Sequence, residues 1–282
     1  MYADCHTHTK ISPCGEHSAL QMCGFAVENG ISVLGISDHC ECNRYYETEF
    51  YTCNPNDFDS YNNKALFEES MQAIAAAKES FAGQLKLLTA VELGQPTLDT
   101  QAAEKVIADK RLDYVIGSMH QIPNCDDFCG LTYSSRELIQ RQLEIYFREI
   151  VKLCRWGKFN ILAHMTYPIR YIEGDFGIKT DLSPYEEMIR EALKIIIEKG
   201  IALEINSSGL RQKYGGLFPT VKIINTYAEL GGEFVSLGSD SHSGVYIGNG
   251  FPTAAQVALD CSIKYGVYYE SRRPVYYELQ GN

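Results

Sequence analysis

The sequence predicts an α/β fold in which parallel strands close into a barrel. Strand-like and helix-like segments alternate about seven times along the 282 residues, with no linker and no break in composition. Six strand-like segments, spread over the whole chain, each end in a histidine or an acidic residue. A barrel of parallel strands brings all such ends to one face, and the length suits a single domain over residues 1–282.

An open, doubly wound sheet is the alternative architecture. Nucleotide-binding sheets of that kind carry a glycine-rich turn directly after the first strand. Residues 6–15 occupy this position and do not form such a motif. The barrel is therefore the simpler prediction.

The first half of the chain shows helical periodicity alternating with short β-branched runs. A left-handed cap at Gly30 ends the first helix. The expected elements are a strand ending near residue 8, a helix over 18–29, a strand over 31–37, a helix over 61–81, a strand over 85–91, a helix over 100–110 and a strand over 114–119.

The second half repeats the alternation, and its helix boundaries carry recognisable end signals. A capping box at 134–137 opens one helix, and Pro184 lies in the first turn of the next, which Gly200 closes. The expected elements are a helix from 134 to about 156, a strand over 159–163, a helix over 183–200, a strand over 201–205, a helix over 219–230, a strand over 234–238, a helix over 254–265 and extended segments over 266–279.

One long connection, residues 40–60, is polar and aromatic and has no periodicity. Compact domains usually keep such connections for a lid or a binding loop. We expect this segment to cover the functional site.

Charge and composition exclude several classes of protein. The net charge is -11, the pI is about 5.1 and no block of Lys or Arg occurs, which argues against a nucleic-acid polymer as partner. No apolar run is long enough to span a bilayer. The amino terminus lacks the apolar core of a signal peptide, so the ten cysteines are expected to be reduced thiols in the cytoplasm. Their spacing does not match a zinc ribbon.

The strand ends supply metal-ligand residue types. His6 and His8 lie two residues apart on an extended chain, so both imidazoles point to the same side and can bind one metal ion. The other candidates at strand ends are Asp38-His39, Glu92, His120, His164 and Asp240-Ser241-His242. This inventory exceeds the needs of one ion and predicts two or three, with Glu92 as a bridge. Nitrogen and oxygen ligands without organised thiolates suit zinc, manganese or iron.

Such a centre is suited to phosphate ester hydrolysis. A hydroxide held between two ions roughly 3.5 to 4 Å apart is a nucleophile at neutral pH, and the ions neutralise charge on the attacked group. Arg170 and Arg211 follow strand ends and can bind a phosphate on the same face, and Lys213 is a further candidate. The predicted substrate is therefore a small phosphorylated molecule.

The motifs resemble those of a known superfamily. They are His6-Thr7-His8, Ser37-Asp38-His39, Glu92, Gly117-Ser118-Met119-His120, Ala163-His164 and Gly238-Ser239-Asp240-Ser241-His242. In residue type and order, across the whole chain, this set resembles the signature of the PHP (polymerase and histidinol phosphatase) superfamily. Residues 114–120, residues 204–211 and Phe218-Pro219 are similar to its monofunctional histidinol-phosphatase branch.

This resemblance implies a distorted seven-stranded, TIM-like (β/α)7 barrel with a multinuclear metal centre at the C-terminal ends of the strands. It also implies hydrolysis of L-histidinol phosphate to L-histidinol and phosphate, in histidine biosynthesis. Carried over by position, the ligands of one ion are His6, His8, Glu92 and Asp240. Glu92 then bridges to a second ion at His120 and His164, and a third binds His39 and His242. Arg170 and Arg211 grip the phosphate, and they are expected to be catalytic residues together with Asp240 and His242.

One position departs from the family pattern. Related histidinol phosphatases often have His or Asp six residues after the second histidine, where this chain has Cys14. Either Cys14 as a thiolate or His17 from a shifted loop completes the third site, or that site is weak or empty. Glu204, with the acidic 40–60 loop, is a candidate to receive a cationic amine of the substrate.

Three other functions fit parts of the pattern. The first is a PHP phosphoesterase that acts on another small phosphomonoester or on a nucleotide. The second is a metal-binding or regulatory module without catalysis, which the full set of ligand types disfavours. The third is a protein-tyrosine phosphatase of the same superfamily, which needs an open groove rather than a covered one.

Overall fold

The computed structural model describes residues 1–45 and 63–281. Its central feature is a sheet of parallel strands in chain order: β1 (Ala3–Thr7), β2 (Val33–Ile36), β4 (Lys86–Gly94), β5 (Tyr114–Ser118), β6 (Ile161–Leu162), β7 (Ala202–Asn206) and β8 (Phe234–Gly238). A parallel bridge joins Thr7 to Ser241, and the backbone N–H of His8 donates to the carbonyl of Ser241 at 2.8 Å. These contacts bring the chain after β8 back to β1, so the predicted TIM-like arrangement of parallel strands is confirmed.

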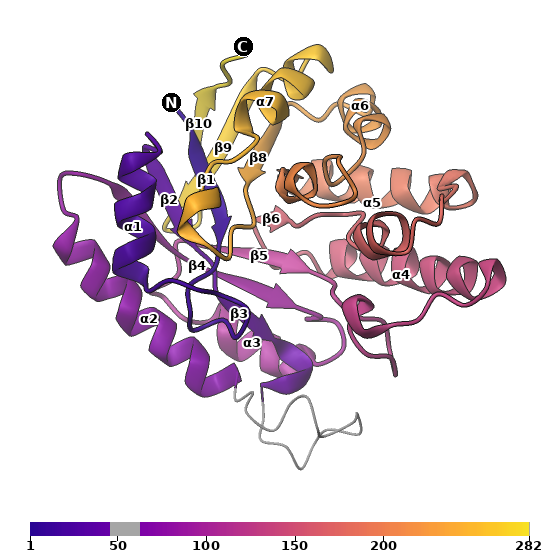
Figure 1. Cartoon of the computed structure of the whole chain (residues 1–282), viewed down its shortest axis with the longest axis horizontal. Coiled ribbons are helices and arrows are strands. Elements are labelled where there is room, and N and C mark those ends of the chain that lie inside the picture. The colour runs from indigo at the N-terminus through magenta and orange to yellow at the C-terminus, as the bar shows by residue number, and fades with distance from the viewer. Residues whose placement is uncertain (46–62, 282) are drawn as a thin grey trace.

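A terminal hairpin distorts the ring. β9 (Tyr265–Glu270) pairs in parallel with the start of β8 and antiparallel with β10 (Arg273–Glu278). β9 also lies beside β1, where the Cys5 thiol is 3.9 Å from the carbonyl of Val267. The hairpin therefore lies between the N-terminal part of β8 and β1. The two termini lie near each other, and the amino group of Met1 donates to Gln280 Oε1 (Figure 1).

Helices surround this sheet (Figure 1). They are α1 (Ala19–Glu28), α2 (Asn63–Ser80), α3 (Thr100–Ile107), α4 (Arg136–Trp156), α5 (Glu186–Lys199), α6 (Val221–Glu229) and α7 (Phe251–Asp260). Ser18 caps α1 through a capping box, and Gly157 and Gly200, both with positive φ, end α4 and α5. The apolar faces of the helices and the strands form one buried cluster around the sheet.

Three local features differ from the sequence-based expectation. α7 was expected over 254–265, but it begins at Phe251, where Pro252 follows the left-handed Gly250, and it ends before Ser262 with φ +68°. The N-cap of α4 is Ser135, whose side chain accepts from Leu138 N, rather than Ser134. Finally, β3 (His39–Glu41) pairs with β4 where a loop was expected.

Residues 46–60 of the predicted lid lie outside the described residues. The nine cysteines of the described part form no disulfide with one another. In that same part, no helix combines the length and the apolar character needed to cross a membrane.

Candidate metal centre and substrate cavity

Six imidazoles converge where the strands end at their C-terminal side. His6 lies in β1 and His8 follows it, while His39 begins β3. His120, His164 and His242 each follow the end of a strand, β5, β6 and β8 respectively. All six belong to groups of side chains whose ligand atoms lie close together or contact Glu92 directly. The predicted convergence on one face is therefore present.

Glu92, at 0% exposure, lies at the centre of the cluster. Its Oε1 is 3.0 Å from His120 Nε2 and 2.9 Å from His164 Nε2. Its Oε2 faces three more imidazole nitrogens, His39 Nδ1 at 2.8 Å, His6 Nε2 at 3.3 Å and His8 Nε2 at 3.5 Å. Each carboxylate oxygen thus serves a different set of histidines, which is the geometry that a bridging ligand requires.

Asp240 is held in a backbone conformation that is uncommon for aspartate. Its φ is +49°, in the left-handed region. Arg211 stabilises this turn, because its Nη1 and Nη2 donate to the carbonyls of Ser239 and Asp240 at 2.7 and 2.8 Å. The turn directs Asp240 Oδ1 to within 3.4 Å of His8 Nε2 and 3.6 Å of His242 Nδ1.

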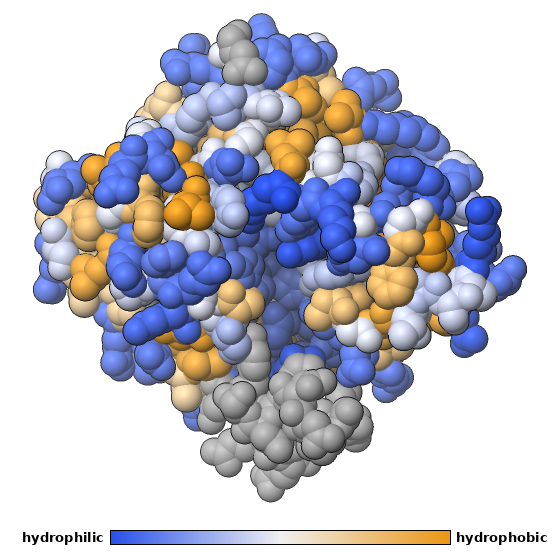
Figure 2. Space-filling view, in the orientation of Figure 1, coloured by the Kyte–Doolittle hydropathy of each residue, from blue (hydrophilic) through white to orange (hydrophobic). Residues whose placement is uncertain are grey.

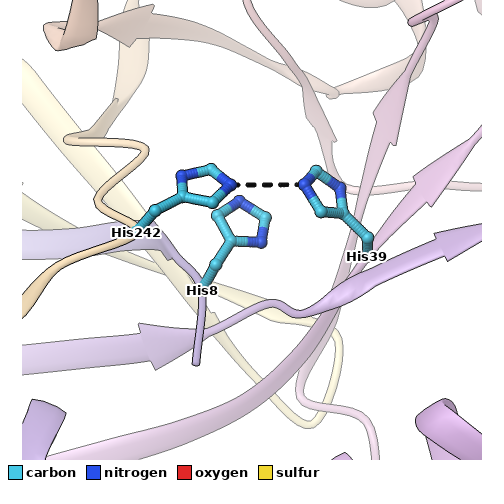
Figure 3. A group of neighbouring side chains, drawn as sticks. All are labelled: His8, His39 and His242. Carbon is cyan, nitrogen blue, oxygen red and sulfur yellow. Dashed lines mark hydrogen bonds between the residues drawn. The ribbon is translucent and has the colours of Figure 1, made fainter. Parts of the chain in front are cut away.

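Three histidines of the cluster, His8, His39 and His242, lie close together (Figure 3). The ring of His8 stacks on those of His39 and His242, with centroids 4.2 Å apart in both pairs, and the Nε2 atoms of His39 and His242 are 3.4 Å apart. Cys14 lies beside this pair. Burial raises the pKa of its thiol, but the charges and hydrogen bonds of His39 and His242 outweigh burial and lower the pKa to about 6.

His17, the other candidate for this position, has a different environment. Its Nδ1 accepts a hydrogen bond from Gly244 N at 3.2 Å, and its ring packs edge-on against Phe25. It does not line the cavity, whereas Cys14 does. The loop therefore brings Cys14, and not His17, to the histidine pair.

Two buried glutamates orient metal-facing histidines from behind. Glu204 Oε1 is 2.6 Å from His6 Nδ1, and Glu41 Oε1 is 3.0 Å from His120 Nδ1. A carboxylate on Nδ1 fixes the tautomer in which Nε2 is free to bind a metal ion. The sequence interpretation missed Glu41, although it lies two residues after His39 on an extended segment and so points to the same side.

Neighbouring charges in the cluster shift the pKa values of its histidines. Burial opposes protonation of His6, but Glu204, Glu92 and Asp240 raise its pKa well above the usual range. Burial also opposes protonation of His120, yet Glu92 and Glu41 raise its pKa to about 10. Conversely, burial and the neighbouring His242 and His39 hold the pKa of His8 well below its usual range.

The carboxylates show the opposite balance. Burial raises the pKa of Glu92, but the charges of His120, His6 and His39 lower it well below its usual range. Burial also raises the pKa of Asp240, but the charge of His6 and a hydrogen bond from His8 lower that pKa well below its usual range. Both groups are therefore negatively charged at neutral pH, as metal ligands must be.

The donor set fits divalent metal ions. His6 Nε2, His8 Nε2 and Glu92 Oε2 are buried and make no hydrogen bond, which is costly unless another partner such as a cation satisfies them. Among the described residues, four groups of side chains have ligand atoms within 4.8 Å of one another: His8, His39 and His242; His6, Glu92 and His164; His6, His8 and Asp240; and His39, Glu41 and His120. Imidazole and carboxylate ligands of this kind are typical of zinc, manganese and iron sites.

The cluster opens into a cavity of about 430 Å³. Figure 2 shows a hollow lined by hydrophilic residues near the centre of this face. Arg170 and Arg211 both line the cavity, and Arg170 Nη1 is 3.9 Å from Asp240 Oδ2. The predicted phosphate-binding arginines are thus adjacent to the metal-ligand cluster.

Two predicted substrate contacts do not reach this cavity. Glu204 is 1% exposed, and its Oε2 accepts from His164 N at 2.6 Å and from Asn206 Nδ2 at 3.2 Å while Oε1 faces His6. It lies behind the histidines, so the expectation that it receives a substrate amine is wrong. Lys213 extends into solvent and pairs with Asp175 at 3.5 Å, outside the cavity.

A model of the PHP domain matches residues 4–208, the segment that supplies His6, His8, Glu92, His120 and His164. The chain belongs to the PHP domain family. The resemblance seen in the sequence is therefore confirmed.

Other members resemble this PHP chain over nearly their whole length. A probable histidinol-phosphatase of Clostridium acetobutylicum is 30% identical over 276 residues, which cover 96% of this chain and 98% of that protein. One of Deinococcus radiodurans is 26% identical over 261 residues, covering 91% and 92%. The crystal structure of histidinol phosphate phosphatase from Lactococcus lactis, complexed with zinc, L-histidinol and phosphate, has a TM-score of 0.74 at 18% identity and covers 97% of this chain and 98% of its own. That structural likeness shows a shared fold.

Proposed function

We propose that this PHP chain hydrolyses L-histidinol phosphate to L-histidinol and phosphate, a step of histidine biosynthesis. The observation that carries the proposal is the convergence of six histidines, Glu92 and Asp240 on a cavity that also contains two arginines. Full-length relatives named as histidinol-phosphatases support the choice of substrate. The enzyme class is a phosphoric monoester hydrolase.

We infer two or three divalent ions, zinc, manganese or iron, as cofactors. His6, His8 and Asp240 would hold one, and Glu92 would link it to a second at His120 and His164. His39, His242 and the low-pKa thiol of Cys14 would hold a third. When bound, such ions supply Lewis acidity, which makes water a nucleophile at neutral pH and neutralises charge on a phosphoryl group.

The side chains of the cavity then have distinct tasks. Arg170 and Arg211 bind phosphate oxygens, and their planar forks favour a dianionic, tetrahedral group. Arg211 also fixes the Asp240 turn through two backbone carbonyls, so one side chain couples substrate binding to ligand geometry. Asp240 lies between the arginines and the histidine cluster, because its Oδ2 is 3.9 Å from Arg170 Nη1 and its Oδ1 is 3.6 Å from His242 Nδ1.

The remaining parts of the proposal concern the whole protein. One buried core that extends from β1 to the terminal hairpin supports a single domain over residues 1–282. The lack of disulfides among the nine described cysteines supports a reducing compartment, the cytoplasm. The acidic net charge of -11 supports a small phosphorylated substrate rather than a nucleic-acid polymer.

Steady-state hydrolysis tests the substrate directly. Protein with its metals counted by elemental analysis would be assayed on L-histidinol phosphate, several other phosphomonoesters and a dinucleotide. We expect kcat/KM for histidinol phosphate to exceed the others by about a hundredfold or more, about 2.7 kcal/mol of differential transition-state binding. Flat activity across the panel would refute the assignment and leave a PHP phosphoesterase for another small monoester.

A further inference from the structure

The outer part of the cavity contains a carboxylate that is not part of the histidine cluster. Asp127 lies in the connection between β5 and α4, at the start of a short 3-10 turn, Phe128–Gly130. It lines the same cavity as Arg170 and the histidines. Asp127 is therefore placed to contact a substrate bound in this cavity.

The two hydrogen bonds that Asp127 accepts both go to its Oδ1 atom. Cys129 N donates to Oδ1 at 2.9 Å, and the Tyr167 hydroxyl donates to the same oxygen at 3.0 Å. Neither bond uses Oδ2, and the thiol of Cys129 is the other neighbour of this carboxylate. Within residues 1–45 and 63–281, Asp127 has no ion pair with a lysine or an arginine. Asp127 is therefore an acceptor oriented through Oδ1, and its charge interacts with that of Arg170 without a direct ion pair.

Tyr167 connects this carboxylate to the metal-ligand cluster. Its ring centroid lies 5.0 Å from that of His120 and 5.1 Å from that of His164, while its hydroxyl bonds to Asp127. The hydroxyl of Tyr171 is 2.8 Å from that of Tyr167, and the two rings pack edge-on. The Tyr167 side chain thus lies between the Asp127 carboxylate and the imidazoles, and the Tyr171 ring packs beside it.

The other acidic residues that line the cavity face the histidine cluster or lie on the side of Cys14. Glu92 and Asp240 face the imidazoles, and Glu41 is 5% exposed with one oxygen on His120. Glu16 lies on the side of Cys14 and His242, where its backbone N–H donates to the carbonyl of His242. Asp127 is the acidic group that combines an open cavity position with aromatic faces, which attract cations.

We propose that Asp127, with Tyr167 and Tyr171, forms the subsite for the cationic ammonium group of the substrate. This inference rests on the proposed function, since histidinol phosphate has a phosphate dianion at one end and an ammonium a few bonds away. The phosphate binds at the histidine cluster and the arginines, and the ammonium binds at Asp127. The separation of the two charges along the cavity orients the ester bond and discriminates against phosphomonoesters that lack a cation.

The experiment compares D127N and D126N holoenzymes on L-histidinol phosphate and on phenyl phosphate, which has no cation. Asparagine retains the acceptor for Cys129 N and Tyr167 but lacks the charge. For D127N we expect kcat/KM on histidinol phosphate to fall about 10- to 100-fold, since hydrogen bonds to charged groups contribute about 1.5 to 3 kcal/mol. Activity on phenyl phosphate should change less than about twofold, and D126N should match the wild type, because Asp126 does not line the cavity.

Product inhibition gives a second readout. The inhibition constant of L-histidinol should rise in D127N by a similar factor, while that of inorganic phosphate stays constant. If D127N kept the wild-type preference for histidinol phosphate, the subsite would be refuted and the proposed function would stand. An equal loss on both substrates would also refute it, because Asp127 would then support the whole cavity. A wild-type enzyme with no preference would refute the proposed function, and the subsite with it.

Discussion

Replacing Glu204 by glutamine tests how the protein fixes the tautomer of His6. Glu204 accepts at both oxygens, from His6 Nδ1 at 2.6 Å and from the backbone N–H of His164 at 2.6 Å. Glutamine has one oxygen and one NH₂ group. The backbone N–H of His164 can only donate, so the amide oxygen must face it and the NH₂ group must face His6. His6 would then accept at Nδ1 and hold its proton on Nε2, the atom that faces Glu92 and Asp240.

The expected loss is large enough to measure. Removing a carboxylate behind a metal-ligating histidine typically lowers metal affinity about 10- to 100-fold, which corresponds to about 1.4 to 2.8 kcal/mol. Glu204 and His6 are both buried, so solvent cannot replace the lost acceptor. Metal content after dialysis against a graded series of chelator concentrations gives the affinity, and long-range ¹H–¹⁵N NMR spectra report the tautomer of His6.

A matched variant separates this effect from a simple loss of charge. Glu41 faces His120 Nδ1 with Oε1 only, and its Oε2 makes no hydrogen bond. Glutamine can therefore keep its oxygen on His120, and E41Q should lose less metal than E204Q. If E204Q retained wild-type metal content at every chelator concentration, with the proton of His6 still on Nδ1, the reasoning about tautomers would be refuted.

Three further results are expected. R170K should reduce kcat/KM on histidinol phosphate about 10- to 100-fold and weaken inhibition by inorganic phosphate, since lysine cannot form the planar fork; unchanged phosphate inhibition would contradict this role. C14S should lower the number of metal equivalents retained after dialysis, because a serine hydroxyl does not replace a thiolate ligand; an unchanged metal count would exclude Cys14 as a ligand. Zinc binding to metal-free protein at pH 7 should release protons, because the raised pKa values of His6, His39 and His120 keep them protonated while metal binding needs neutral imidazoles, and the release should decline as the pH approaches 10. Calorimetry in two buffers of different ionisation enthalpy measures this release, and equal heats would contradict it.

The convergence of the candidate ligand side chains could be predicted from the sequence because each ligand type follows a short apolar run. Parallel strands in a barrel place their C-terminal ends together whatever the details of packing, so His6, His120 and His164 could be assigned to one face from their positions alone. Glu92 could be proposed as a bridge for the same reason. The order of helices and strands followed from apolar periodicity and from glycine at helix ends.

The sequence did not resolve the roles of side chains that lie behind or beside the strand ends. Sequence position shows that Glu204 is near the site, but a strand residue can face the cavity or the back of a histidine, and only the packing decides between them. Cys14 and His17 occupy one irregular loop, and their roles depend on a turn that no periodicity encodes. Asp127 and Tyr167 come from two separate connections, so only the folded chain brings them together.

Adding zinc stepwise to metal-free protein tests directly whether hydrolysis depends on the proposed metal centre. Metal-free protein would receive zinc in steps while hydrolysis of L-histidinol phosphate is followed at each step. We expect negligible turnover without metal and full activity at two or three equivalents of zinc per chain. Undiminished turnover in protein shown by elemental analysis to contain no metal would contradict it.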